Sequence, residues 1–177
     1  MTSPDDAASR DDLPNELAPD EGPLPPAMKP ERPRDELGRP LPAGEPNRLE
    51  LPYFDEMTLE ECHAEAIRLF DAGNYFGAHE AWETCWAYAK GTDEETFFKG
   101  LAQLGAGYTH WMRGNPRGVV ALLGRAASRI EDRGPTHRGI DAATFRARLD
   151  RLIALAKRYE SHIDPLPDLV AESVPLA

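Results

Sequence analysis

The sequence predicts an all-α domain. Apolar residues recur at helical spacing in five segments between about residues 55 and 165, short turns separate these segments, and no two of them alternate as paired β-strands do. We therefore expect a compact bundle of about five mostly antiparallel helices. The spacing of Gly73, Tyr75, Ala78 and Trp82 is that of a tetratricopeptide helix junction, which predicts tetratricopeptide-like hairpins rather than a full repeat array.

Capping residues indicate where each helix begins. Thr58 and Glu61 have the spacing of a capping box, in which each side chain binds a backbone amide of the other residue. The first helix is expected to start there and to end at Gly73. The later helices are expected to start at these signals: Asn74, the second capping box Thr92-Asp93-Glu94-Glu95, Asn115-Pro116 and Asp141.

Two patterns predict how the helices pack. The third helix contains Gly100 and Gly107, and each glycine costs roughly 1 kcal/mol of helix stability. This cost indicates that another helix packs closely against the backbone at these positions. We expect that helix to be the second one. The core is expected to be led by these residues: Phe70, Trp82, Trp86, Leu101, Leu104, Leu123 and Leu149.

The two ends of the chain differ in composition from the middle. Residues 1–50 hold eleven of the seventeen prolines and carry twelve acidic against six basic residues, so this segment cannot bury enough apolar surface to fold. We expect a disordered acidic Pro-rich tail over 1–50, a helical domain over 55–165 and a C-terminal tail over 166–177.

The overall charge excludes some classes of partner. A formal net charge of −11 gives no basic surface for nucleic acid or for anionic lipid. Because no apolar run reaches roughly 18 residues and no secretory signal pattern is present, we expect a cytoplasmic protein that does not contact a membrane. The two cysteines, Cys62 and Cys85, are expected to be reduced core residues.

Residues 73–86 concentrate aromatic and ionisable side chains. Tyr75, His79, Trp82 and Trp86 fall on one helical face, with Glu83 at its edge one turn after His79. The candidate binding pocket comprises Tyr75, His79, Glu80, Trp82, Glu83, Trp86, Gln103 and His110.

The sequence allows two interpretations of this pocket. His79, Glu83 and Gln103 fit a hydrogen-bond network that fixes the packing of the second and third helices, and they equally fit the polar floor of an aromatic-walled pocket. We expect no metal and no cofactor. If the second and third helices run antiparallel, His79 and His110 lie roughly 9 Å apart along the helix axis, which is too far for both to bind one metal ion. His63 is expected to be a core histidine.

The function favoured by the sequence is a non-catalytic module that binds a small molecule or a protein. The alternative is a small hydrolase-like enzyme that uses His79 and Glu83 as an acid-base pair, with or without a metal. No nucleophile or oxyanion donor stands out beside this pair. A homodimer would be the natural explanation of any apolar face left exposed after the helices pack.

Three blocks of residues carry a family resemblance. They are Phe70-x-x-Gly73-x-Tyr75-x-x-Ala78-His79-Glu80-x-Trp82-Glu83-x-x-Trp86, then Lys99-Gly100-Leu101-x-Gln103-Leu104, then Gly114-Asn115-Pro116-x-Gly118. In this order and spacing they resemble the domain-of-unknown-function family 309 over roughly residues 55–132. The resemblance implies an all-helical bundle and no established reaction. Similar proteins commonly have an aliphatic residue or glutamine where this chain has Gly105 and Gly107.

Overall fold

The structure is a computed structural model that describes residues 32–161, 165–170 and 173–176. Within these residues the chain forms a one-turn 3-10 helix, five α-helices and one short β-hairpin. The elements are the 3-10 helix Phe54–Glu56, α1 Leu59–Asp71, α2 Tyr75–Ala89, α3 Glu95–Met112, α4 Pro116–Glu131, β1 Thr136–His137, β2 Ile140–Asp141 and α5 Ala142–Tyr159.

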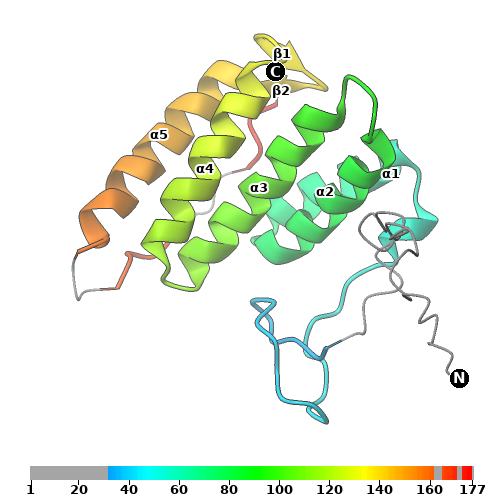
Figure 1. Cartoon of the computed structure of the whole chain (residues 1–177), viewed down its shortest axis with the longest axis vertical. Coiled ribbons are helices and arrows are strands. Elements are labelled where there is room, and N and C mark those ends of the chain that lie inside the picture. Colours follow the sequence, from blue (N-terminus) through cyan, green and yellow to red (C-terminus); the bar gives the residue numbers. More distant parts are fainter. Residues whose placement is uncertain (1–31, 162–164, 171–172, 177) are drawn as a thin grey trace, which may run out of the picture.

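The helices pack in chain order. α1 contacts α2, α2 contacts α3, α3 contacts α4 and α4 contacts α5, as Figure 1 shows for the row of helices from α1 to α5. Short turns reverse the chain between successive helices of α1 to α4, so these neighbours run antiparallel. The all-α fold class predicted from the sequence is confirmed.

Most helix starts lie where the sequence predicts them. Thr58 and Glu61 form the reciprocal capping box of α1, and the side chains of Asn74, Asn115 and Asp141 cap α2, α4 and α5. The predicted capping box of α3 does not form. The Thr92 hydroxyl donates to the Ala89 carbonyl instead, because the chain turns tightly from α2 into α3.

The segment between α4 and α5 contains a short hairpin. Thr136 pairs with Asp141 and His137 with Ile140 in antiparallel register. The two turn residues, Arg138 and Gly139, have φ values of +47° and +76°. Two consecutive positive φ angles suit a two-residue hairpin turn, and Arg-Gly is a weak sequence signal for one.

The core forms one cluster, and six of its seven predicted leading residues are buried. Trp86 is the exception, because it is only partly buried at the edge of the core. Cys62 and Cys85 are buried free cysteines, as predicted.

The glycines of α3 face two different helices. A Cβ at Gly100 or Gly107 would meet α4 side chains, those of Arg129 and Leu123, so the prediction that these glycines face α2 is wrong. Gly105 faces α2, where a Cβ would lie 2.7 Å from the backbone nitrogen of His79. Since α3 lies between α2 and α4, its glycines are shared between two close contacts.

The N-terminal tail predicted over residues 1–50 is described only from residue 32. Within this part, Arg113 donates two hydrogen bonds to the carbonyl of Leu37. The guanidinium carbons of Arg34 and Arg113 lie 5.1 and 5.7 Å from the centre of the Phe76 ring. Residues 1–31 lie outside the described residues.

The C-terminal tail predicted over residues 166–177 contacts the bundle in its described part. Trp111 donates to the Pro167 carbonyl, and the Val174 amide donates to Asp71 of α1. These two backbone groups therefore have hydrogen-bond partners in the bundle.

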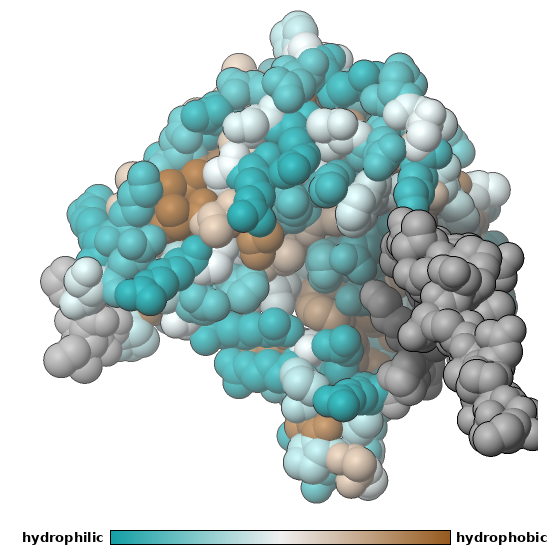
Figure 2. All heavy atoms as spheres, viewed as in Figure 1, coloured by the Kyte–Doolittle hydropathy of each residue, from teal (hydrophilic) through white to brown (hydrophobic). Residues whose placement is uncertain are grey.

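The face of the molecule seen in Figure 2 is mainly polar. No helix among them is both long and apolar enough to cross a membrane. Figure 2 shows a largely hydrophilic face on which apolar residues form small separate spots rather than one broad patch.

Candidate functional site

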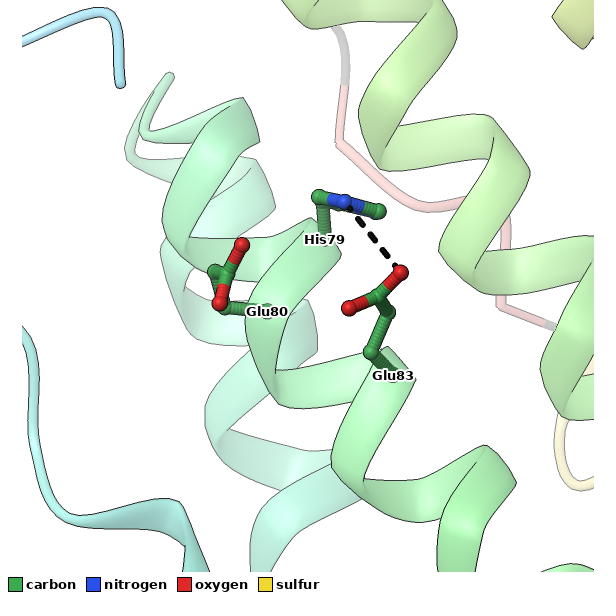
Figure 3. Close-up of side chains that lie close together, drawn as sticks. All are labelled: His79, Glu80 and Glu83. Atoms are coloured by element: carbon green, nitrogen blue, oxygen red, sulfur yellow. Dashed lines mark ion pairs between the residues drawn. The ribbon is translucent and has the colours of Figure 1, made fainter. Parts of the chain in front are cut away.

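His79 and Glu83 lie one turn apart on α2. Asn74 caps this helix and fixes the residue at which it begins, which determines the directions of the side chains that follow. His79 Nε2 is 3.6 Å from Glu83 Oε1, and Figure 3 shows the two side chains turned toward each other. The separation is too long for a direct hydrogen bond, so the pair is in contact without a shared proton bridge.

The imidazole of His79 is oriented by α3. Its Nδ1 lies 2.9 Å from the carbonyl oxygen of Ala102. A carbonyl only accepts, so Nδ1 carries the hydrogen and donates it. In the neutral ring, Nε2 is then an acceptor, and it faces a carboxylate that is also an acceptor.

Gly105 makes this contact between α2 and α3 possible. A Cβ at that position would lie 2.8 Å from the Cα of His79. Such a contact is impossible without moving a helix, so only glycine permits the observed helix distance. The position of His79 therefore depends on Gly105, which has no functional side chain.

Glu80 completes a cluster with His79 and Glu83. One ligand-type atom from each of the three residues lies within 4.8 Å of the others, and all three residues are half-buried. Figure 3 shows Glu80 leaving α2 on the other side of His79 from Glu83. Among the described residues this is the group of imidazole and carboxylate side chains with spacing suited to a metal ion.

Trp86 lies one turn beyond Glu83. The Lys99 ammonium of α3 is 4.6 Å from the centre of its ring, a cation-π contact. Trp86 is only partly buried, so part of its ring is exposed.

Two other predicted wall residues lie in the core. Tyr75 packs against Phe70 and Tyr108, with ring centroids 5.0 Å from each. Trp82 is fully buried, and its indole Nε1–H donates to His63 Nδ1. The helical face that carries these aromatics is turned into the bundle, because α1 covers it.

Gln103 and His110 make their hydrogen bonds on the α4 side. Gln103 Oε1 accepts from Arg129, so this oxygen links α3 to α4, whereas the predicted network used Gln103 to join α3 to α2. His110 Nδ1 lies 2.9 Å from Asn115 Nδ2. Burial lowers the pKa of His110, and the charges of Arg113 and His79 lower it further.

A shallow hollow lies over α4, away from the pair on α2. It is lined by Thr96, Ala121, Gly124, Arg125, Ser128, Arg129 and Asp132. None of the predicted site residues lines it, and an open shape with mixed charges gives it no distinct ligand chemistry.

A second polar cluster was not anticipated from the sequence. Glu94, at the start of α3, accepts from His137 Nε2 at 2.8 Å and from Arg138 Nε at 2.6 Å. Burial alone would raise the pKa of Glu94, but these hydrogen bonds outweigh it and the pKa is lowered. The partners lie more than forty residues apart in the chain, so no local pattern could indicate them.

His63 lies beneath this cluster and is buried, as predicted. Its Nε2 has no hydrogen-bond partner among the described residues. Burial, with the Arg138 charge acting in the same direction, lowers the pKa of His63 to about 4. His63 is therefore a neutral part of the core.

Comparison with known proteins gives one match. Residues 63–122 match the family model described as "Domain of unknown function (DUF309)", which confirms the family predicted from the sequence. The matched region holds α2, α3 and the His79–Glu83 pair. No curated protein matches the chain, and no solved structure matches it.

Proposed function

We propose that this DUF309 domain is a non-catalytic binding module whose ligand is held on α2, at His79 and Glu83. The observation that carries the proposal is the orientation of the pair. Ala102 holds His79 so that Nε2 faces the Glu83 carboxylate at 3.6 Å, and the two side chains remain 20% and 36% exposed. Both side chains are thus held in place, and neither forms a hydrogen bond with the other.

The arrangement favours a ligand group that donates hydrogen bonds or carries positive charge. An imidazole acceptor beside a carboxylate attracts such a group, whereas a second acceptor would be repelled. Trp86 already holds the Lys99 ammonium over its ring at 4.6 Å, so an aromatic face suited to cations adjoins the pair. A small organic cation and a basic segment of a protein both fit this chemistry.

The enzyme alternative has less support, because the nearest nucleophilic groups are occupied. Thr84 donates its hydroxyl hydrogen to the Glu80 carbonyl, and Thr109 donates to the Gly105 carbonyl. Both cysteines are fully buried. An acid-base pair without a nucleophile or an oxyanion donor supports binding better than acyl or phosphoryl transfer.

The test is a thermal-shift screen on the full chain in the presence of EDTA. The ligands would be primary amines, guanidino compounds and short Lys- or Arg-containing peptides. We expect at least one class to raise the Tm of the wild type, and of the control Glu56→Gln, but not of Glu83→Gln. Glu56 is an exposed acid outside the site, so it matches the change in charge. An equal response in Glu83→Gln, or none in the wild type, contradicts the proposal.

A further inference from the structure

We propose that the outward face of α2, α3 and α4 is the interface of a two-fold symmetric homodimer, in which α4 of a second copy is the basic segment held at His79 and Glu83. This inference rests on the proposed function, since it names the protein segment that occupies the same site. The sequence analysis linked a homodimer to an exposed apolar face, whereas this interface depends on charge.

The outward face runs across three neighbouring helices. α3 packs against α2 on one side and against α4 on the other, and Figure 1 shows the three helices in this order. The side of α3 that neither neighbour covers carries exposed or half-buried residues at helical spacing: Thr96, Lys99, Gln103, Ala106 and His110. Lys99 contacts α2 through Trp86, and Gln103 contacts α4 through Arg129. The site on α2 and the outer surface of α4 therefore border the same stripe of α3.

The packing of α3 fixes the height of α2 relative to α4. A Cβ at Gly105 would lie against His79, and a Cβ at Gly107 would lie against Leu123. Because α3 and α4 run antiparallel, the α4 residue level with Gly105 is two positions after Leu123, which is Arg125. His79 and Arg125 therefore lie at the same height on two helices that run in the same direction.

The two outer helices carry opposite charge at matching heights. Glu83 is one turn beyond His79, and Arg129 is one turn beyond Arg125, so the carboxylate and the guanidinium are also level. The same division extends along the chain, because residues 116–160 carry ten basic and five acidic residues, whereas residues 32–115 carry eight basic and fifteen acidic residues. The net charge of the whole chain conceals this basic side.

Both α4 arginines have N–H groups left for a partner. The side chain of Arg125 has no hydrogen bond or ion pair among the described residues. Arg129 donates from Nη1 to the uncharged amide of Gln103, and a guanidinium has five N–H groups. Within the described part of the chain, no acid neutralises either charge.

A two-fold axis parallel to α3, in the plane of the face, uses this complementarity twice. Rotation by 180° about this axis places α2 of each copy on α4 of the other, at the same height and in the same direction. The partner's Arg125 then meets His79, and the partner's Arg129 meets Glu83. An axis across α3 would instead place α2 on α2, with acid facing acid. The charges therefore select one arrangement.

The shallow hollow over α4 fits the next turn of α2. Trp86 lies three residues after Glu83 and is therefore level with Asp132, which lines the hollow. In the dimer, the partly buried Trp86 ring of one copy enters the hollow of the other, and the Lys99 ammonium over that ring faces the partner's Asp132. The hollow has room for it, because a Cβ at Gly124 would meet nothing within 4 Å. A tryptophan seated in a partner's hollow is typical of interface anchors.

The test is sedimentation velocity of the full chain at concentrations up to about 0.3 mM. We expect a dimer whose Kd rises with salt, because exposed charge pairs are screened. Glu83→Arg and Arg129→Glu should each raise the dimer Kd by at least about a hundredfold, since each reversal brings like charges together at both edges of the interface.

The decisive measurement mixes these two variants. A heterodimer of Glu83→Arg with Arg129→Glu has opposite charges at both edges, whereas each variant alone pairs like charges. We expect the mixture to sediment as a dimer under conditions in which each variant is a monomer. Recovery on mixing also shows that both variants are folded.

Two controls carry the same charge changes outside the interface. Glu56 precedes α1 and Arg158 lies near the end of α5, and both are exposed. Glu56→Arg and Arg158→Glu should dimerise as the wild type does. A monomeric wild type, a dimer that both interface variants retain, or a mixture that stays monomeric would each overturn the inference.

The dimer and the proposed function can fail separately. If the chain is a monomer but an added amine or basic peptide raises the Tm through Glu83, the binding module remains and the dimer falls. If charge reversal controls the dimer but no added ligand responds to Glu83→Gln, the dimer stands and the binding of a separate ligand falls.

Discussion

His63 on α1 and His79 on α2 differ in what surrounds the imidazole. His63 is 7% exposed, accepts from the Trp82 indole and lies beneath the Glu94 cluster. The His79 side chain is 20% exposed, donates to a backbone carbonyl and directs its other nitrogen toward a carboxylate at the surface. Burial makes the first imidazole a neutral core group, whereas partial exposure leaves the second with a nitrogen that can meet a ligand.

The same contrast applies to two tryptophans of α2. Trp82 is fully buried and donates to His63. Trp86 is partly buried and carries Lys99 over its ring. Of these two tryptophans on successive turns of α2, Trp82 is therefore part of the core and Trp86 is partly at the surface.

Removal of the buried tryptophan should have the largest effect. Trp82→Ala should lower the free energy of unfolding by about 3 to 5 kcal/mol, because it leaves a cavity and an unpaired His63 Nδ1. Trp86→Ala should cost clearly less, about 1 to 2 kcal/mol, since part of that ring is already exposed. Urea denaturation of both variants measures the difference, and equal losses would contradict the contrast in burial.

The pH dependence of stability should report His63. Its pKa is about 4 in the folded chain and about 6.5 when unfolded, so the unfolded chain binds the proton more strongly. The stabilisation is complete above about pH 6.5 and is lost as the pH falls toward 4, by about 3 kcal/mol in all.

The control for this pH effect is His63→Asn. The asparagine Oδ1 can accept from Trp82 as Nδ1 does, but it does not titrate. Urea midpoints at several values between pH 7 and pH 4 should fall less steeply in this variant than in the wild type. Parallel curves for the two proteins would mean that His63 is not the group responsible.

The contact that holds His79 should be sensitive to one methyl group. Gly105→Ala places a Cβ 2.7 Å from the His79 nitrogen, and overpacking of this kind costs about 1 to 3 kcal/mol. Gly124→Ala is the matched control on α4, where a Cβ meets nothing within 4 Å. That change should stabilise the protein by roughly 0.5 to 1 kcal/mol through helix propensity. Thermal or urea unfolding should therefore move in opposite directions for the two variants.

Neutralisation of the site acid should have the smallest effect on stability. Glu83→Gln should change the free energy of unfolding by less than about 0.5 kcal/mol, because Glu83 is 36% exposed and 3.6 Å from His79. A loss of 1 kcal/mol or more in urea denaturation would show that the pair is a structural network, since a buried partner would then be left unsatisfied.

Local signals in the sequence determined most of the fold. Thr58 with Glu61, Asn74, Asn115 and Asp141 cap the helices they were predicted to cap. A cap depends on residues within about four positions of each other, so the sequence contains all that is needed to predict it. The spacing of His79 and Glu83 is local in the same sense, which is why the centre of the candidate site was predictable.

Only the tertiary structure decided what each helix face meets. Gly100 and Gly107 face α4 while Gly105 faces α2, and Gln103 binds Arg129 rather than His79. Helical periodicity places these residues on faces of α3 but does not say which neighbour covers a face, because both α2 and α4 pack against it. The Glu94 cluster depends likewise on segments that are distant in the chain and adjacent only after folding.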